Sequence, residues 1–352
     1  MANLISLELR RRLKRTAVGA GLDVALLLKS LGAMKAAAGV GAIFTLHHVR
    51  PYSPLPFAPN RHLEITPQFL DRTIRELKAE GRIFVALDEL PQRIAAGGAT
   101  RFAAFTLDDG NRNNVEHALP VFERHGVPVT IFVAKGLSER THSMWWETLS
   151  ILLRERETLA FDFGRGLERL DLGDLAQKQL AFERFAAFVQ GTDEMEAVSA
   201  IDWLAEDEGI QPLEIVRALI MDFGALQTLA RHPLVSLGAH TVSHRALARL
   251  SPAEVAFEIR ESADYVAAIT GRRPTTVAYP YGTASAVSAR EGQIAASLGF
   301  TVGVTTRPGT VPSTAAAPMT LLPRISLNGY YQKPRYVEAL ASGIPMRMIG
   351  KG

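Results

Sequence analysis

Two adjacent carboxylates, Asp108 and Asp109, follow the apolar run Phe102–Leu107 and precede Gly110. The run is typical of a buried strand, because it is short, uncharged and bounded by a turn signal. At the strand end glycine lets the backbone turn, so both acids can face one cleft. Adjacent acids repel unless a cation or hydrogen bonds compensate them. The pair therefore indicates either a reactive site or a solvated turn.

A second pair of chemically useful side chains is His240 and His244, four residues apart. On a helical turn this spacing places two imidazoles on one face, where they can bind one cation. Alone, such a pair is more often incidental. A carboxylate from another strand end would complete a set of two His and one Asp that leaves positions open for water and substrate. The chain has no cysteine, so any metal must use His, Asp or Glu. We expect Zn²⁺, with Co²⁺, Ni²⁺ and Mn²⁺ as alternatives.

These side chains belong to a wider pattern, in which polar groups follow apolar strands. The strands are expected at 40–49, Phe102–Leu107, Val235–Ala239 and Thr275–Ala278, and the polar groups are His48, Asp108–Asp109, His240 and Tyr279–Gly282. Further strands are expected at Phe84–Leu87, Val127–Ala134, Phe300–Thr305 and Leu321–Leu327. Helices are expected at Pro67–Gly81, Asn114–His125, Pro252–Thr270, Ala286–Leu298 and Tyr331–Ser342. This alternation predicts an α/β protein with a parallel sheet or barrel, whose C-terminal rim would carry the polar groups.

The alternation is interrupted between residues 140 and 234, and about 95 residues are too many for a plain loop. We therefore expect three parts: an N-terminal basic helical segment at 1–38, a barrel made of 39–139 and 235–345, and a helical insertion at 140–234. The segment Pro308–Pro318 reads as a loop of small residues.

The composition narrows the function. The formal net charge of +3 does not indicate nucleic-acid binding, and 47% hydrophobic residues can form a substantial core. Residues 8–15 are basic, but the apolar stretch that follows contains Asp23 and lacks a clear cleavage site, so we expect no ordinary secretion signal. We expect a cytoplasmic protein. A basic amphipathic helix can contact an anionic membrane surface, although packing on the domain is the commoner arrangement.

Three motifs together resemble the polysaccharide deacetylase family (carbohydrate esterase family four). They are Thr106–Gly110, His240–His244 and Tyr279–Gly282, in the family's order. The strand ending in His47-His48 also resembles the branch that acts on exported or membrane-associated poly-N-acetylglucosamine. The resemblance covers roughly residues 40–135 and 235–330. It implies a distorted (β/α) barrel of about seven strands and metal-dependent removal of an acyl group, usually acetyl, from an amino sugar.

By the same resemblance, Asp109, His240 and His244 would hold the metal, and Asp108 would be the general base. The backbone N–H of Tyr281 would help to hold the oxyanion. The family often has an arginine that orients the base, and the corresponding position here is Ala278. Arg324 is the candidate replacement for this arginine.

The family's late histidine, its general acid, is also missing, because no histidine follows His244. We therefore predict His48 as the general acid, with His47 as the weaker candidate. The insertion is longer than in a minimal family member, and its Trp145 and Trp146 are candidates for stacking on sugars, although buried aromatics are the commoner case.

Three functions remain open at this stage. The first is an N-deacetylase acting on a polysaccharide, oligosaccharide or glycolipid. The second is a deformylase or other amide hydrolase acting on a lipid-linked sugar, and the third is an inactive sugar-binding module. The retained Asp108–Asp109 pair argues against the third, since binding alone needs no free base beside a metal. The expected partner is an N-acetylated glycan, and the sequence does not indicate an oligomeric state.

Overall fold

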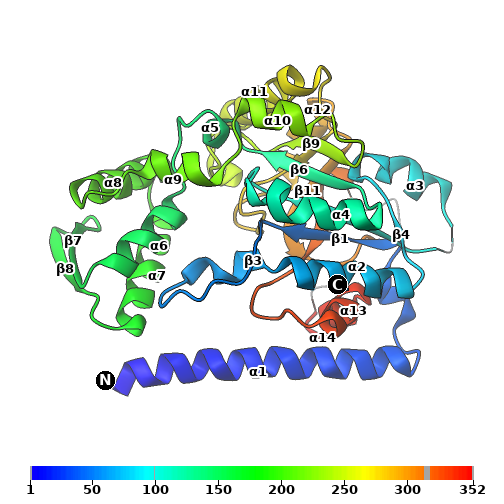
Figure 1. The fold of residues 1–352 in the computed structure, drawn as a ribbon, viewed down its shortest axis with the longest axis horizontal. Helices are drawn as coiled ribbons and strands as arrows, with labels where there is room; N and C mark the ends of the chain where they lie inside the picture. Colours follow the sequence, from blue (N-terminus) through cyan, green and yellow to red (C-terminus); the bar gives the residue numbers. More distant parts are fainter. Residues whose placement is uncertain (1, 99, 313–317, 351–352) are drawn as a thin grey trace.

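In the computed structural model, which describes residues 2–98, 100–312 and 318–350, seven parallel strands form a closed barrel (Figure 1). The strands run in the order β1-β12-β11-β10-β9-β6-β5, and β5 pairs with β1 to close the ring. Their bounds are β1 (Gly41–Leu46), β5 (Phe102–Leu107), β6 (Val129–Val133), β9 (Val235–Ala239), β10 (Thr276–Ala278), β11 (Val302–Pro308) and β12 (Leu322–Ser326). The expected distorted (β/α) barrel is confirmed.

The central strands β1 and β5 are buried along their whole length. Strands covered on both faces need continuous apolar sequence, and that is what both segments contain. The two strands pair in register from Gly41 opposite Phe102 to Leu46 opposite Leu107. They therefore end together, and Asp108 emerges beside His47.

Helices surround the barrel between successive strands, and those that begin at Pro67 and Pro252 begin where the sequence predicts. The Thr66 side chain caps the first of them, and Ser251 forms a capping box with Glu254. The helices around the barrel are α2 (Pro67–Ala79), α3 (Leu90–Ala96), α4 (Leu119–His125), α11 (Pro252–Thr270), α12 (Ala289–Ser297), α13 (Pro334–Ala341) and α14 (Ile344–Met348). Short helical turns are η1 (Lys35–Ala38), η2 (Pro59–Leu63), η3 (Leu87–Glu89), η4 (Asn114–Ala118), η5 (Leu247–Arg249) and η6 (Met319–Leu321).

Three expectations need correction. The strand predicted at Phe84–Leu87 is only β4 (Ile83–Phe84), because the chain turns into η3 at Leu87. The last barrel helix begins at Pro334 rather than Tyr331, in agreement with the preference of proline for the first helical turn. Residues 48–49 leave the barrel and form β2 (His48–Val49), which pairs with β3 (Glu64–Ile65). Of the predicted loop Pro308–Pro318, residues 313–317 lie outside the described part.

Between β6 and β9 the chain forms a mainly helical layer beside the barrel (Figure 1). Its helices are α5 (Lys135–Ser138), α6 (Trp145–Glu155), α7 (Leu175–Gly191), α8 (Glu194–Asp207), α9 (Pro212–Leu219) and α10 (Phe223–Leu229). It also contains an antiparallel hairpin that the sequence analysis did not predict, β7 (Thr158–Asp162) with β8 (Leu167–Asp171). In β7 only Leu159 and Phe161 are buried, so the strand covers the helices with one face.

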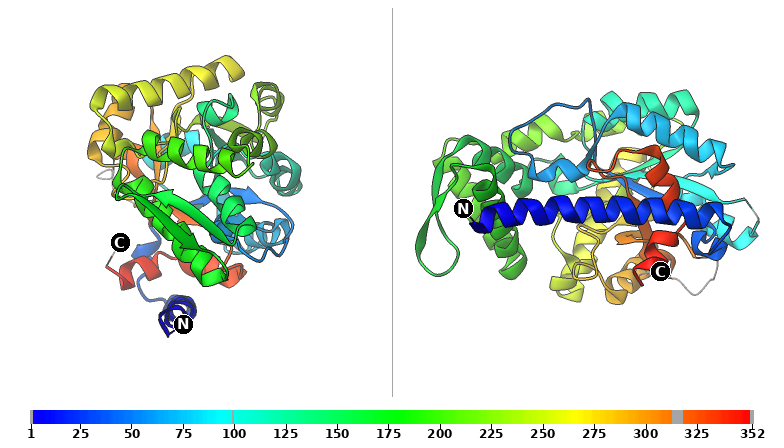
Figure 2. Two further views of the ribbon diagram at one scale, coloured as in Figure 1. Left: turned by 90° about the vertical axis from the view of Figure 1, so that its left-hand side faces the viewer. Right: turned by 90° about the horizontal axis from the view of Figure 1, so that it is seen from below.

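The N-terminal helix α1 (Ala2–Ser30) lies along one side of the molecule against α13 and α14 (Figure 2). Its inner face buries Leu22 and Ala25 against Tyr336 and Ala339. No helix within the described residues combines the length and apolarity needed to cross a bilayer.

Candidate active site

Three side chains from two strand ends converge at the C-terminal rim of the barrel. Asp109 follows β5, and His240 and His244 follow β9. One ligand atom from each lies within 4.8 Å of the others. The Oδ1 atom of Asp109 lies 3.4 Å from the Nε2 atom of each histidine. The structure thus brings together the three residues that the sequence analysis proposed as metal ligands.

The His240 ring is fixed by a hydrogen bond of 2.8 Å between its Nδ1 and the carbonyl oxygen of Ala278. A carbonyl only accepts, so Nδ1 carries the proton and the Nε2 lone pair faces Asp109. The His240 backbone N–H donates to the Ser262 hydroxyl and to the carbonyl of Val133. Helix α11 and strand β6 therefore hold this ligand in place.

A buried carboxylate on α11, Glu258, holds the loop between the two histidines. It accepts hydrogen bonds from the backbone N–H groups of Val242 and Ser243, at 2.8 and 2.9 Å. It also bonds the Arg245 guanidinium. The sequence analysis missed Glu258 and Ser262, because their signal is only two polar residues within a helix that otherwise packs on the barrel.

Backbone strain is concentrated in these loops. Six non-glycine residues in the described ranges have positive φ, and four of them belong to the site: Asp109 (74°), Thr241 (64°), His244 (56°) and Tyr281 (59°). Such conformations cost about 1–3 kcal/mol each and persist only where surrounding contacts enforce them. The strain supports an active role for these loops.

The three residues fit a divalent cation. The Asp109 Oδ1 atom is buried and has no hydrogen-bond partner among the described residues, which is costly for a carboxylate unless a cation compensates it. Burial raises the pKa of Asp109, but the neighbouring His240 and His244 hold it well below its usual value, so the carboxylate is ionised. An Asp with two His suits Zn²⁺ and also Co²⁺, Ni²⁺ and Mn²⁺.

Asp108 is held by a fully buried arginine, Arg324 of β12. The guanidinium donates two hydrogen bonds of 2.7 Å, one to each carboxylate oxygen. It also donates to the Thr106 hydroxyl at 3.0 Å and to the Thr305 carbonyl at 2.8 Å. Burial raises the pKa of Asp108, but the charge and hydrogen bonds of Arg324 outweigh it and lower the pKa. The candidate replacement for the missing family arginine thus contacts the candidate base.

The two adjacent histidines have different surroundings. His47 lines the pocket, with its Nε2 3.9 Å from Asp108 Oδ2. His48 is 1% exposed and is not among the pocket-lining residues. Its Nδ1 lies 2.9 Å from the side-chain nitrogen of Asn113, and burial lowers its pKa to about 3. The structure therefore places His47, and not the predicted general acid His48, at the pocket, because the chain leaves the barrel at this point and buries the His48 side chain.

Tyr281 follows β10 and closes the site on the side of the insertion. No hydrogen-bond partner for its backbone N–H is found within the described residues, so this donor is available. The Tyr281 hydroxyl donates to Glu194 at 2.7 Å and accepts from Trp145 Nε1 at 3.0 Å. Helices α6 and α8 of the insertion therefore fix the Tyr281 ring.

These groups line a pocket of about 360 Å³. The barrel contributes Asp108, Asp109, His240, His244, Tyr281 and His47, and the insertion contributes Trp145, Trp146, Phe182 and Gln190. Both tryptophans belong to the core of the insertion and also border the pocket. The aromatic wall suits the apolar face of a sugar ring. The sequence does not identify Phe182 and Gln190 as pocket residues, since their approach depends on how the insertion folds back.

Residues 218–303 match the family model described as polysaccharide deacetylase, and this part contains the His240–His244 and Tyr279–Gly282 motifs. Solved structures with a similar fold include the deacetylase PplD of Streptococcus pyogenes in complex with acetate (18% identity, TM-score 0.53, 82% of this chain and 92% of that chain). Another is IcaB from Ammonifex degensii (16% identity, TM-score 0.53, 87% of this chain and 98% of that chain). A polysaccharide deacetylase from Bacillus cereus is also similar (14% identity, TM-score 0.53, 86% of this chain and 68% of that chain).

At these identities the similarity to solved structures is one of fold. No curated protein sequence matches this chain. The match over residues 218–303, together with the shared barrel, confirms the resemblance to the polysaccharide deacetylase family.

Proposed function

We propose that this protein removes N-acetyl groups from amino sugars of a glycan by metal-dependent hydrolysis. The observation that carries the proposal is the ionised Asp108, clamped by Arg324 beside the cluster of Asp109, His240 and His244. The family match and the barrel fold support deacetylation of a polysaccharide. The substrate and the metal are part of the proposal.

In the proposed mechanism, separate residues hold the metal, accept the proton of water and stabilise the oxyanion. Asp109, His240 and His244 would hold a divalent cation, which would supply the Lewis acidity that amide hydrolysis needs to polarise the carbonyl and acidify water. Asp108 takes a proton from the attacking water, and Arg324 keeps its two oxygens oriented and the carboxylate ionised. The Tyr281 N–H donates to the carbonyl oxygen as negative charge develops there.

The departing amine needs a proton, and we propose that His47 supplies it. His47 is the histidine of the pair that borders the pocket, with Nε2 3.9 Å from Asp108 Oδ2. The proton that Asp108 removes from water can thus pass to the amine through a neighbouring imidazole. Its side chain is 20% exposed, and burial lowers the pKa of His47 while the charges of Asp109 and Asp108 oppose that shift.

The inactive-module alternative is disfavoured by the same geometry. Sugar binding alone does not require a buried Arg–Asp pair next to three converging metal ligands. Burying these charges is costly, so their presence favours a catalytic role. The test is metal analysis of the purified protein combined with acetate and formate release from N-acetylated and N-formylated glucosamine oligomers. Release of acetate with about one equivalent of metal per chain supports the proposal. Formate alone would indicate a deformylase, and neither product would indicate a binding module.

We also propose that α1 rests on an anionic membrane surface. Its outward face is apolar at three- and four-residue spacing, with Leu13, Ala17, Ala20, Val24 and Leu27, and Leu31 follows directly after the helix. Leu13, Leu27 and Leu31 are 59%, 60% and 73% exposed. The adjoining sequence at 10–15 contains five basic residues, which complement anionic lipid headgroups.

A further inference from the structure

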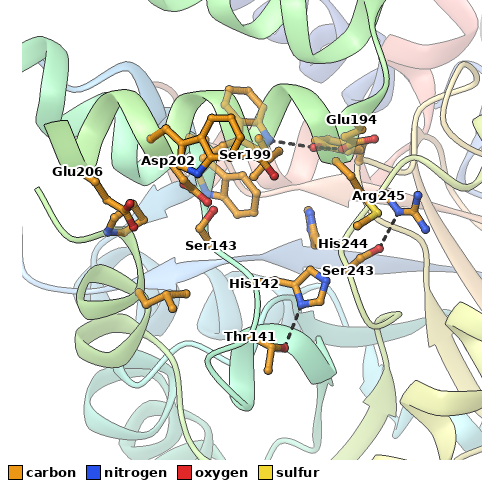
Figure 3. Close-up of a pocket in the computed structure, with 18 residues that line it drawn as sticks. Thr141, His142, Ser143, Glu194, Ser199, Asp202, Glu206, Ser243, His244 and Arg245 are labelled. Atoms are coloured by element: carbon orange, nitrogen blue, oxygen red, sulfur yellow. Dashed lines mark hydrogen bonds between the residues drawn. The ribbon is translucent and has the colours of Figure 1, made fainter.

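A second pocket, of about 310 Å³, lies between the insertion and the loop that carries His244 (Figure 3). It shares Trp145, Trp146, His244 and Tyr281 with the reaction pocket. These four side chains thus form the wall between the two cavities. Only this layer of side chains separates the second pocket from the reaction pocket.

One face of helix α8 lines the second pocket. Ser199, Asp202 and Glu206 lie along this face, one turn apart, while Ile201 and Ala205 on the other side are fully buried in the core of the insertion. Met195 and Val198 border the pocket too, so the helix presents a mixed polar and apolar face to the cavity and a purely apolar face to the core of the insertion.

Trp203 is the third tryptophan of the chain and borders the same pocket. It is 72% exposed, whereas Trp145 and Trp146 are 7% and 8% exposed. An indole left in water at a pocket rim offers a flat apolar surface for the face of a pyranose ring. Its π-face also attracts an ammonium group.

The charge of this pocket is negative. Asp202 and Glu206 are four residues apart on α8, where like charges repel, and neither forms an ion pair with a residue in the described ranges. Arg245, the nearby cation, is already engaged by Glu258. Burial raises the pKa of Asp202 to about 6; a hydrogen bond from Ser143 opposes this shift and the charge of Glu206 adds to it, as expected of a carboxylate that lacks a cationic partner.

Unmet hydrogen-bonding capacity is concentrated here as well. Within the described part of the chain, the buried Nδ1 atom of His244 lines this pocket and has no hydrogen-bond partner, and Ser143 and Asp202 have only each other as side-chain partners. His244 is only 9% exposed. In Figure 3 the Ser143 hydroxyl points toward the Asp202 carboxylate, with His142 and His244 on the other side of the cavity. Hydroxyl and amine groups of a bound sugar can satisfy such atoms.

We propose that the second pocket binds a glucosamine unit, an amino sugar with a free amine, of the same glycan whose N-acetylated unit occupies the reaction pocket. The ammonium group pairs with Asp202 and Glu206, and the ring packs on Trp203. The inference rests on the proposed function, and it makes the enzyme prefer glycans that already carry a deacetylated unit.

The test uses two pocket variants: Trp203→Ala, and a double variant that combines Asp202→Asn and Glu206→Gln. Each is compared with a matched control. Asp207→Asn removes an exposed acid next to the pocket, and Phe257→Ala removes an exposed aromatic on α11. Acetate release is measured on a fully N-acetylated glucosamine trimer and on trimers in which one unit has a free amine. Binding of a fully deacetylated glucosamine trimer, which has no acetyl group to lose, is measured by calorimetry.

Both pocket variants should raise KM for the amine-bearing trimer about tenfold and weaken calorimetric binding similarly, with kcat within about twofold of wild type. The double variant should leave KM for the acetylated trimer unchanged. If both trimers respond equally to the double variant, or if neither variant has an effect while acetate release persists, the subsite is refuted and the proposed function stands. Trp203-dependent binding without acetate release from any trimer would instead refute the proposed function and retain the subsite.

Discussion

Arg324 and Asp108 form a parallel pair of hydrogen bonds, each 2.7 Å long, although 216 residues separate them in the chain. Arg324 lies on β12 and Asp108 follows β5, so the side chain reaches across β1, the strand between them. The guanidinium is fully buried, and its further donors go to Thr106 and Thr305. Such a bidentate clamp fixes the direction of both carboxylate oxygens as well as their charge.

Asp108→Asn should abolish turnover without loss of metal. The amide keeps the shape of the side chain but cannot accept a proton, so kcat should fall by about 10²- to 10⁴-fold. Acetate release and metal content measured on the same preparation check this. Asp109→Asn is the matched control, and it should lose the metal. Substantial activity in Asp108→Asn would mean that another group is the base.

Arg324→Met should destabilise the protein as well as inactivate it. The variant leaves Asp108 buried and unpaired, which typically costs about 3–5 kcal/mol. Arg324→Lys retains the charge but loses the parallel geometry, so it should recover stability more than kcat. Urea unfolding and kcat are measured on both variants. Wild-type stability together with wild-type kcat in Arg324→Met would show that the clamp has no role.

His47→Gln and His48→Gln should separate the two candidates for the general acid. His47 borders the pocket, so its loss should lower kcat by about 10²- to 10⁴-fold. His48 is bonded to Asn113 inside the protein, so its replacement should mainly lower the melting temperature. A large loss of kcat in a stably folded His48→Gln variant, with His47→Gln active, would reverse the assignment.

Much of the fold could be predicted from local sequence. Short apolar strands, the Thr66 and Ser251 caps and the glycine that ends α11 each depend on residues close in the chain, and the barrel follows from their order. The hairpin β7–β8 was not predicted because only β7 alternates buried and exposed residues, and because the hairpin lies within a helical region.

The candidate site could be predicted less completely. Motifs identified Asp109, His240 and His244, which the structure brings together. The distinction between His47 and His48 depends on where the strand ends. Side chains alternate along a strand, so an error of one residue places the buried histidine at the pocket and the pocket histidine in the core. The placement of Phe182 at the reaction pocket and of Trp203 at the second pocket depends on long-range packing of the insertion, which no local pattern encodes.

Asp71→Asn should reduce stability in a pH-dependent way. Burial raises the pKa of Asp71, but hydrogen bonds from His125, Arg124 and Arg75 outweigh it and set the pKa below its ordinary value of 3.8. A depressed pKa means that the ionised carboxylate stabilises the folded state above pH 3.8 and that this is lost as pH falls through the folded pKa.

The Asp71→Asn variant should therefore be less stable than wild type by about 1–3 kcal/mol near neutral pH. The difference should shrink below about pH 4. Denaturant unfolding at several pH values measures it, with the exposed Asp88→Asn as control. A difference that stays constant down to pH 2 would show that the Asp71 charge is not the cause.

Leu27→Gln combined with Leu31→Gln should weaken binding to anionic vesicles. These side chains are more than half exposed and lie opposite the face that packs on α13, so they stabilise little in the folded protein. Burying each in a lipid interface contributes about 1.5–3 kcal/mol, so the double variant should bind at least about tenfold more weakly. Co-sedimentation with phosphatidylglycerol and phosphatidylcholine vesicles measures this. Phe257→Gln, on α11, is the control for a lost exposed hydrophobic residue. Equal vesicle binding by wild type and the double variant would contradict a lipid contact, because the apolar stripe would then face water. Self-association of the wild type that the double variant abolishes would also contradict it, because the stripe would then face another copy of the chain.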